Sequence, residues 1–202
     1  MSLFRKLFGS KSGKATERDQ VEERSKYMPE IELPVEERFT INFKANGGKF
    51  RYCENQNEVE NDFQLILEEN NWRKEKVLLL DDRLAERFKS FNLNSTKNPS
   101  EASYFFTTCE YLIGNDGSLL ISSNQIAEKK LRELPLNFVI FATTSQFIEN
   151  ISEGLHGIKT RNRDKIPTNI TTIKHFKASD DGDFLSYGSS TKNLYLLLLE
   201  DL

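Results

Sequence analysis

Two polar segments that contain glycine are the places where this chain of 202 residues has the chemistry to hold a ligand. Residues 114–118 read Gly-Asn-Asp-Gly-Ser between two apolar runs, and residues 188–192 read Gly-Ser-Ser-Thr-Lys just before the apolar C-terminal run. Backbone N–H groups in a turn can form a nest for an anion, and hydroxyls with an ammonium group can bind a carboxylate or phosphate. The candidate ligand-binding residues are Asn115, Asp116, Gly117, Ser118, Gly188, Ser189, Ser190, Thr191 and Lys192.

The first segment also has an ordinary structural interpretation. An Asn-Asp-Gly-Ser sequence between apolar runs is a strong signal for a β-hairpin, here over residues 110–122, because Gly117 can adopt a positive φ. An acidic stretch around Gly182 precedes the second segment, but it lacks the closing glutamate of the twelve-residue calcium loop. It is predicted to be a solvated turn, and no metal site is expected.

Cysteine and histidine are too scarce for cluster or metal chemistry. Cys53 and Cys109 are far apart and neither has a second cysteine nearby, so the spacing of an iron–sulfur or zinc site is absent. Each is predicted to be a small buried residue at the end of a strand. His156 and His175 lack the partners of a histidine metal site. We therefore expect this chain to bind no cofactor by itself.

Composition limits the remaining classes of function. The chain is 37% apolar and 29% charged, which fits one globular domain with a tail. A formal net charge of −3 gives no basic field for phosphate backbones, so nucleic acid is not an expected partner. There is no apolar run of the roughly 20 residues that a membrane-spanning helix needs and no signal-peptide pattern. A cytoplasmic protein without a transmembrane segment is the expectation.

The first 34 residues differ in amino-acid composition and apolar pattern from the rest. Residues 3–8 carry apolar side chains on one helical stripe, with Arg5 and Lys6 on the other face. A charged segment rich in small residues follows and ends at Pro34, which is typical of a flexible arm. The amphipathic stub has the features to dock onto the body of the protein, a partner or a membrane surface. Residues 1–34 are thus predicted to be a stub and arm, and residues 35–202 a single domain.

Helix and strand signals alternate through that domain. A helix is expected after Pro34, with Phe39 and Phe43 on its buried side and Gly47 at its end. A second helix is expected to start at an Asn57 N-cap, with Glu60 completing a capping box. Apolar runs predict buried strands of a parallel sheet. The predicted strands are a short one at residues 49–53 and three apolar runs at residues 76–82, 136–144 and from 193 to the end.

A third helix is expected directly after the strand over residues 136–144. Thr144 or Ser145 would be its N-cap, and Ile151 and Leu155 are among the apolar residues that would face inward. The whole pattern predicts an α/β fold with an open, mainly parallel sheet, helices on both faces and a local β-hairpin.

Four stretches together resemble the lactate-utilisation protein C type of family, also called the LUD domain family. They are FKANGGKFRYC, CEYLIGNDGSLLIS, LPLNFVIFATTSQFIENI and YGSSTKNLYLLLLEDL, and they cover residues 35–202 in order. The resemblance implies a fold like that of the ribose-5-phosphate isomerase and CoA-transferase superfamily. It also implies a role in oxidation of L-lactate to pyruvate, with iron–sulfur clusters in partner oxidoreductase subunits and none in this chain.

The resemblance leaves the chemistry of this chain open. Family members show an Ala-Glu-Thr-Gly-Thr kind of segment whose acidic position falls on Asn115, and an amide cannot form the acyl intermediate of a CoA-transferase. The family's Gly-x-His-Gly-Pro segment has lost its histidine and proline near residue 188. Catalytic residues are therefore unassigned.

Three hypotheses about function follow. The first is an accessory subunit or regulator that binds an anionic metabolite or a redox partner between the 114–118 turn and the 188–192 loop. The second is an acyl-CoA or sugar-phosphate enzyme that uses the same pocket. Convergence of Glu110, Asp116 or Asp180 with Lys192 in one cleft would favour this enzyme. The third is a scaffold without a small-molecule site.

Overall fold

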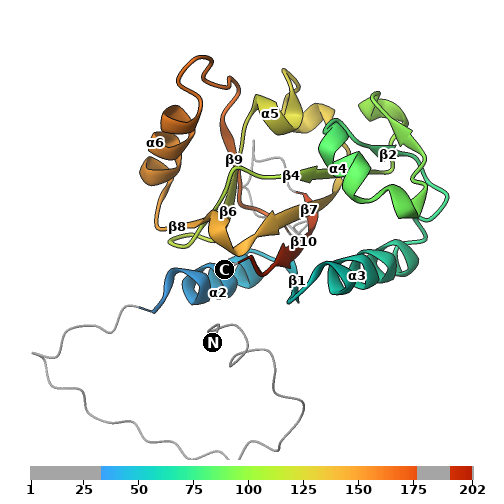
Figure 1. The fold of residues 1–202 in the computed structure, drawn as a ribbon, viewed down its shortest axis with the longest axis horizontal. Coiled ribbons are helices and arrows are strands. Elements are labelled where there is room, and N and C mark those ends of the chain that lie inside the picture. The colour runs from blue at the N-terminus through green and yellow to red at the C-terminus, as the bar shows by residue number, and fades with distance from the viewer. Residues whose placement is uncertain (1–32, 177–191, 202) are drawn as a thin grey trace, which may run out of the picture.

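The computed structural model describes residues 33–176 and 192–201 (Figure 1). The predicted N-terminal arm lies outside these residues except for its last two positions, and the predicted acidic turn and candidate residues 188–191 also lie outside them. Short 3-10 turns connect several elements. The helices are α2 (Val35–Ala45), α3 (Gln56–Glu69), α4 (Asp82–Arg87), α5 (Ser123–Ile126) and α6 (Ile151–Arg161).

Six strands form the main sheet, and each neighbouring pair is parallel. Because all strands run the same way, their carboxyl ends meet at one edge of the sheet. This arrangement confirms the predicted open, parallel α/β architecture. The spatial order is β1 (Lys49–Cys53), β10 (Asn193–Leu199), β7 (Asn137–Thr143), β4 (Tyr104–Thr108), β2 (Val77–Leu78) and β3 (Ser95–Thr96).

The central strands are apolar on both sides because both faces of the sheet are covered. In β7, Phe138 and Ile140 join one buried cluster, whereas Val139 and Phe141 join the cluster on the opposite face. Helix α2 adds Phe39 and Phe43 to the first cluster, and helices α3 and α4 pack into the second. Side chains alternate across a strand, so a strand between two layers must be apolar at every position.

A second sheet of four strands shares the first face with α2. Its order is β8 (Phe147–Ile148), β5 (Tyr111–Ile113), β6 (Ser118–Ile121) and β9 (Thr171–Ile173). Strands β5 and β6 form the predicted hairpin, in which Ile113 lies opposite Ser118. The hairpin is therefore confirmed. It is also extended on both sides, by parallel β8 and antiparallel β9, which the sequence did not indicate.

The predicted start of the third helix is wrong. Thr144 and Ser145 lie in a 3-10 turn, the chain then forms β8, and helix α6 begins only at Ile151. Its N-cap is Asn150, whose side chain accepts an N–H of the first turn. The buried side of this helix carries Gly154 and Ile158, whereas Ile151 and Leu155 are 39% and 43% exposed instead of buried.

Helix α3 starts two residues before the predicted position. Asn55 is the N-cap, and its side chain accepts a hydrogen bond of 3.0 Å from the backbone N–H of Glu58. The sequence offers the same Asn-x-x-Glu spacing at residues 55 and 57, and the structure uses the earlier one. The strand predicted over residues 76–82 is also shorter, because only β2 pairs and Asp81 already caps α4.

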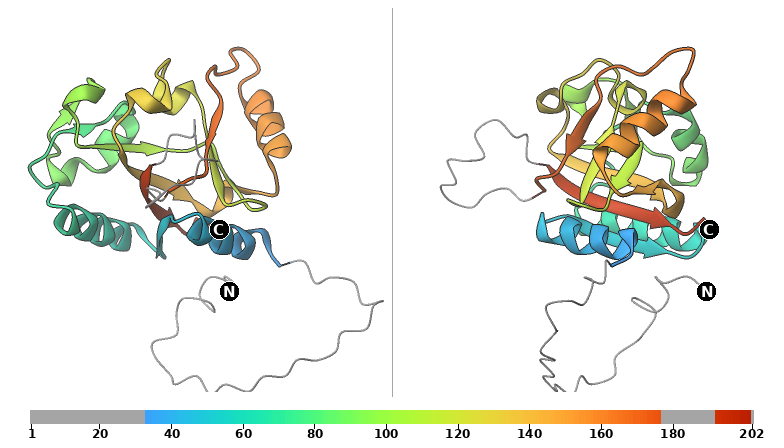
Figure 2. Two further views of the ribbon diagram at one scale, coloured as in Figure 1. Left: turned by 180° about the vertical axis from the view of Figure 1, so that it is seen from behind. Right: turned by 90° about the vertical axis from the view of Figure 1, so that its left-hand side faces the viewer.

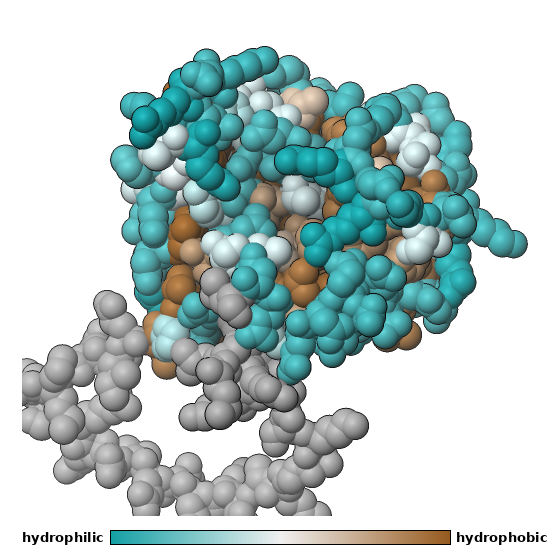
Figure 3. Space-filling view, viewed as in Figure 1, coloured by the Kyte–Doolittle hydropathy of each residue, from teal (hydrophilic) through white to brown (hydrophobic). Residues whose placement is uncertain are grey.

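Helix α6 lies at one end of the described domain, and the segment around β2 and α4 lies on the opposite side of the sheet (Figures 1 and 2). Hydrophilic side chains cover most of the face in Figure 3, with apolar residues visible between them. Within residues 33–176 and 192–201, no helix has the length and hydropathy that crossing a bilayer requires.

Candidate functional site

A cavity of about 390 Å³ opens at the carboxyl edge of the main sheet. This volume lies within the roughly 300–1,000 Å³ typical of small-molecule pockets. Open α/β sheets bind ligands at this edge, where the loops that follow the strands meet. Segments after β2, β4 and β7 form its walls together with α4, α5 and α6. The lining residues are Asp81, Arg83, Leu84, Arg87, Thr108, Cys109, Glu110, Asn124, Gln125, Phe141, Gln146 and Arg161.

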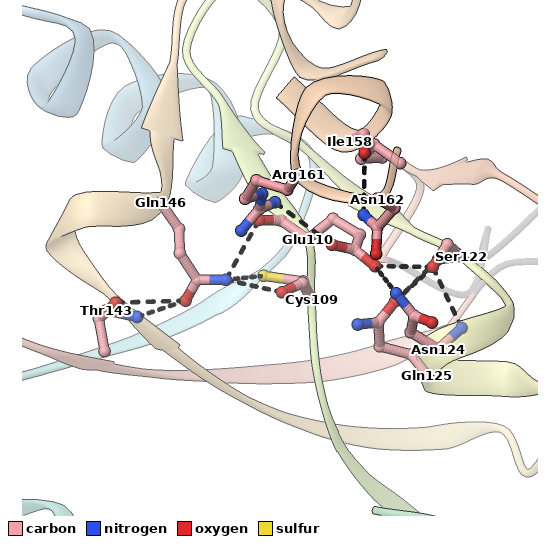
Figure 4. A network of polar contacts seen from close by, with 10 residues as sticks. All are labelled: Cys109, Glu110, Ser122, Asn124, Gln125, Thr143, Gln146, Ile158, Arg161 and Asn162. Atoms are coloured by element: carbon pink, nitrogen blue, oxygen red, sulfur yellow. Dashed lines mark hydrogen bonds and ion pairs between the residues drawn. The ribbon is translucent and has the colours of Figure 1, made fainter. Parts of the chain in front are cut away.

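Glu110 is the buried carboxylate of this cavity. It follows β4 by two positions, and its side chain is only 8% exposed. One carboxylate oxygen accepts hydrogen bonds from Ser122 Oγ at 2.7 Å and Asn124 Nδ2 at 2.8 Å. The other oxygen lies 3.4 Å from the guanidinium of Arg161 (Figure 4). Buried charges are retained when they are paired and hydrogen-bonded, and Glu110 meets both conditions.

Helix α4 places two arginines at the cavity. Leu84 and Phe88 are four positions apart and bury their side chains in the core, which fixes the rotation of this short helix. Arg83 and Arg87 have the same spacing one position earlier and both line the cavity. The Arg87 guanidinium lies over the ring of Phe141, 4.5 Å from its centroid, and its Nε donates to Gln56 Oε1. It is thereby held against the end of β7.

Helix α6 brings Arg161 to the opposite wall because two glycines let it approach the second sheet closely. A Cβ at Gly157 would lie 2.1 Å from the hydroxyl oxygen of Tyr111, and one at Gly154 would lie 2.7 Å from a methyl group of Ile148. With the helix at this distance, the guanidinium of Arg161 stacks on the ring of Tyr111, 4.7 Å from its centroid. A stacked guanidinium keeps its N–H edge available for an anion, and in Arg161 this edge lies near the carboxylate of Glu110.

Positive charge exceeds negative charge in the cavity wall, with three arginines and two carboxylates. Arg83 pairs with Asp81 at 3.4 Å, and Arg161 pairs with Glu110. Arg87 has no carboxylate partner within residues 33–176 and 192–201. A guanidinium without a carboxylate at a partly enclosed surface favours an anionic ligand.

The thiol of the cysteine in the cavity wall is buried. Burial, together with the nearby charge of Glu110, raises the pKa of Cys109 far above its usual range, so the thiol stays protonated. The side-chain amide of Gln146 donates to the backbone oxygen of Cys109 at 2.6 Å and fixes this turn. Cys53 is likewise buried at the end of β1, which confirms the prediction made for both cysteines.

The turn at residues 114–118 is docked on helix α2. The Asn42 side chain donates to the backbone oxygens of Gly114 and Asn115, and Asn46 donates to that of Asp116 at 2.7 Å. Asp116 in turn accepts from both N and Oγ of Ser118, a fully buried residue. The side chains of residues 115, 116 and 118 and the carbonyls of residues 114–116 therefore have intramolecular partners, and the turn does not line the 390 Å³ cavity.

Lys192 directly precedes β10 and so lies at the amino edge of the main sheet, opposite to the cavity. Its side chain is buried, and its Nζ donates to the backbone oxygens of Leu134 and Pro135 at 3.1 and 3.0 Å. Its backbone N–H donates to His175, whose neighbour Lys174 lies 3.5 Å from Asp116. The turn and the start of β10 thus contact one segment. A pocket shared with residues 188–191 stays a prediction.

Because Lys192 is buried, we expect the free energy of unfolding to depend on its protonation. Desolvation lowers the pKa of Lys192 to about 8 in the folded protein, below its ordinary value of 10.5. Below pH 8 Lys192 is charged in both states, and burial of the charge lowers the free energy of unfolding. Between pH 8 and 10.5 only the unfolded chain still binds the proton, so the free energy of unfolding rises with pH.

We therefore expect the free energy of unfolding of the wild type to rise by up to about 3 kcal/mol relative to Lys192→Met from pH 8 to pH 10.5. Urea unfolding at several pH values measures this difference. The exposed Lys44→Met is the matched control and should show no such trend. A difference between wild type and Lys192→Met that is independent of pH would contradict the expectation.

The cavity residues were mostly missed by sequence reasoning. The convergence of Glu110 with Lys192 that would favour the enzyme hypothesis is not present, because the two residues lie at opposite edges of the sheet. A signal for Glu110 does exist, because a polar residue directly after a buried run marks the end of a parallel strand. Arg87 and Arg161 carry no such signal, since charged residues on helices are usually solvated.

Two comparisons place the chain among known proteins. The family model of the LUD domain matches residues 36–199. A crystal structure of a DUF162 family protein from Deinococcus radiodurans resembles the fold with a TM-score of 0.57, at 12% sequence identity, over 83% of this chain and 96% of that chain. No protein with a curated description matches the sequence. Because the match to the LUD domain covers most of this chain, the chain belongs to the LUD domain family, which is linked to lactate utilisation.

Proposed function

We propose that this protein is an accessory subunit or regulator of L-lactate oxidation to pyruvate, and that it binds a small anionic metabolite in the cavity at the carboxyl edge of its main sheet. The link of the LUD domain family to lactate utilisation supports the process. The excess of arginines in the cavity wall supports the anionic ligand. The proposed ligand is of the anionic kind expected from the sequence, but its site is this cavity and not the expected pocket between the 114–118 turn and the 188–192 loop.

The single observation that carries the proposal is the environment of Arg87. The guanidinium is held by stacking on Phe141 and by one hydrogen bond to Gln56, yet it faces no carboxylate among the described residues. Such a group offers further N–H donors in a fixed plane, which match the two oxygens of a carboxylate. Asp81 and Glu110 already have arginines of their own.

Electron transfer in this proposal belongs to iron–sulfur oxidoreductase subunits as partners. The cysteines of this chain do not fit a cluster, which needs about four thiolates in one place. The chain has two cysteines, one at the end of β1 and one directly after β4, and both are buried. Within the described residues, no group of three or more histidine, cysteine or acidic side chains is arranged to hold a metal.

The proposal predicts that Arg87→Gln weakens anion binding. Removal of a charge-assisted bidentate contact should raise the Kd for L-lactate about tenfold or more. Thermal-shift titration of the purified full chain measures this, since a ligand that binds only the folded state raises its melting temperature. Arg51→Gln, on the exposed edge strand β1, is the matched control and should titrate as the wild type does.

Two results would contradict this proposal. One is an unchanged melting temperature in the presence of L-lactate, pyruvate and other small carboxylates at millimolar concentration. The other is equal loss of binding in Arg87→Gln and Arg51→Gln, which would indicate a diffuse charge effect in place of a site. The expected titration is one that saturates, weakens with added salt and depends on Arg87.

A further inference from the structure

Another cavity, of about 360 Å³, is formed mainly by helix α3 and by residues 90–93, which follow α4, and we call it the α3 cavity. Leu67, Phe91 and Leu93 give it apolar walls. Leu67 belongs to the buried cluster on this face of the sheet, and Phe91 and Leu93 are partly buried against the same cluster. The α3 cavity shares no lining residue with the cavity at the carboxyl edge, so the proposed anion site does not account for it.

Helix α3 gives the rim of this cavity a negative charge. Its residues 56–69 include five carboxylates and no basic side chain. Glu60 lines the α3 cavity and forms no ion pair within the part of the chain that the structure describes. Arg73, the basic residue of the lining, is paired with Glu68. The α3 cavity therefore combines apolar walls with a carboxylate that has no cationic partner.

The chain itself contains a segment with the complementary properties. Residues 1–14, which lie outside the described residues, include four basic residues and no acidic one. The amphipathic stub within them has an apolar stripe that consists of Leu3, Phe4, Leu7 and Phe8. Apolar side chains gain free energy when they leave water for an apolar cavity, and opposite charges at the rim favour the same placement.

The connection between the stub and the described domain permits this contact. Residues 9–32 join the stub to Leu33, directly before α2, and their extended length is at most about 80 Å. A folded domain of this size has a radius of gyration of about 15 Å. Helices α2 and α3 both contact β1, and they lie along the same side of the described domain (Figure 1). Because the stub is tethered, its effective concentration at the α3 cavity is on the order of millimolar, so a weak contact suffices.

We propose that the amphipathic stub, residues 3–8, docks into the α3 cavity of its own chain. Its apolar stripe packs against Leu67 and Phe91, and its basic residues lie near Glu60 at the rim. An amphipathic segment that lays its apolar face in a groove is a common mode of peptide recognition. This contact is independent of the proposed function, and it assigns the stub to the body of the protein in place of a partner or a membrane.

Paramagnetic relaxation measurements on the ¹⁵N-labelled full chain test the proposal. A nitroxide is attached to the variant Ser2→Cys, and the two native cysteines are both buried, which directs the label to residue 2. The backbone amides of Gln64, Leu67, Phe91 and Leu93 should be broadened selectively, and the broadening should decrease with added salt. Amides at these positions that stay sharp, or broadening spread evenly over the domain, would overturn the proposal.

The variant Glu60→Lys tests the rim directly. It should reduce the relaxation enhancement at the amides of the α3 cavity at least fivefold. Glu133→Lys makes the same change of charge at an exposed glutamate outside α3 and should retain the enhancement. Equal loss in both variants would indicate a diffuse charge effect and contradict a site.

A variant of the stub keeps the test independent of how Glu60→Lys folds. Phe4→Ser combined with Phe8→Ser removes the aromatic part of the apolar stripe and leaves every residue of the α3 cavity in place. The selective broadening should disappear in this double variant. Its persistence would show that the stripe does not carry the contact and would refute the proposal.

Two further samples distinguish the other occupants of this surface and of the stub. In a mixture of spin-labelled chain without ¹⁵N and ¹⁵N-labelled chain without the nitroxide, the cavity amides should stay sharp. Broadening in this mixture would assign the contact to a second copy and overturn docking within one chain. Binding of the labelled stub to vesicles of anionic phospholipid, with sharp cavity amides in their absence, would assign the stub to a membrane and overturn it equally.

Discussion

Gly117→Ala is expected to destabilise the protein by about 3 kcal/mol or more, because no side chain fits at the turn between β5 and β6. A Cβ at this position would lie 2.3 Å from the backbone nitrogen of Phe43 and 2.5 Å from the carbonyl carbon of Asn42. Both atoms belong to the backbone of helix α2, so the whole helix must move. The φ of +68° adds strain for any residue with a side chain.

Chemical unfolding of Gly117→Ala and of a Gly117→Asn variant separates the two causes. Asparagine tolerates a positive φ but keeps the Cβ, so it should be nearly as harmful if the contact with α2 dominates. Asn115→Ala changes an exposed side chain of the same turn and is the control, with an expected loss below about 1 kcal/mol. Wild-type stability of Gly117→Ala would contradict the close packing of the turn against α2.

Phe106→Ala is expected to cost about 3 to 5 kcal/mol, which is the range for removal of a fully buried aromatic ring. Phe106 lies in the middle of β4 and is 0% exposed. Its ring stacks on Phe63 of α3 with centroids 4.5 Å apart, and it meets Phe88 edge-on at 4.8 Å. The substitution would leave a void between the sheet and its helical layer, which rigid strands cannot close.

Equilibrium unfolding of Phe106→Ala should give a lower midpoint with an unchanged denaturant slope. The control is Leu65→Ala on α3, whose side chain is 51% exposed and should change stability by less than about 0.5 kcal/mol. Because Leu84 on α4 packs in the same cluster, the Phe106→Ala variant should also loosen the wall that carries Arg87. Similar small losses for both variants would be incompatible with β4 as a buried central strand.

The parallel sheet could be predicted because its central strands are continuous apolar runs. In β10, Leu196 and Leu197 enter clusters on opposite faces, so burial on both sides is written in the sequence as an unbroken run. The turn at Gly117 could be predicted for a similar local reason, since its residues alone determine its conformation. Both signals depend on neighbouring residues only.

Features that depend on distant contacts could not be predicted. The start of α6 is an example, because Thr144, Ser145 and Asn150 are all suitable N-caps. The structure selects Asn150 since the preceding backbone pairs with β5, where Ile148 O accepts from the N–H of Gly114 at 2.8 Å. The extension of the predicted hairpin into a second sheet could not be predicted either, because strands β8 and β9 are only two and three residues long.

The anion site expected from the sequence stays a prediction, and the cavity at the carboxyl edge is a different location for it. Sequence reasoning looked for an anion site in segments rich in glycine and hydroxyl groups. The cavity instead takes single residues from loops and helices that the fold brings together, such as Glu110 after β4 and Arg161 at the end of α6. Lys192 is a candidate from the sequence, but the fold buries it, and its Nζ donates hydrogen bonds to two backbone oxygens.

Chemical-shift mapping of the ¹⁵N-labelled full chain during titration with L-lactate tests the central claim most directly, because it shows where an anion binds. If the ligand occupies the carboxyl-edge cavity, the backbone amides of Cys109, Glu110, Asn124 and Gln146 should shift in a saturable manner. Shifts confined to residues 114–118 and Lys192, with these four amides unchanged, would contradict the claim and restore the pocket expected from the sequence.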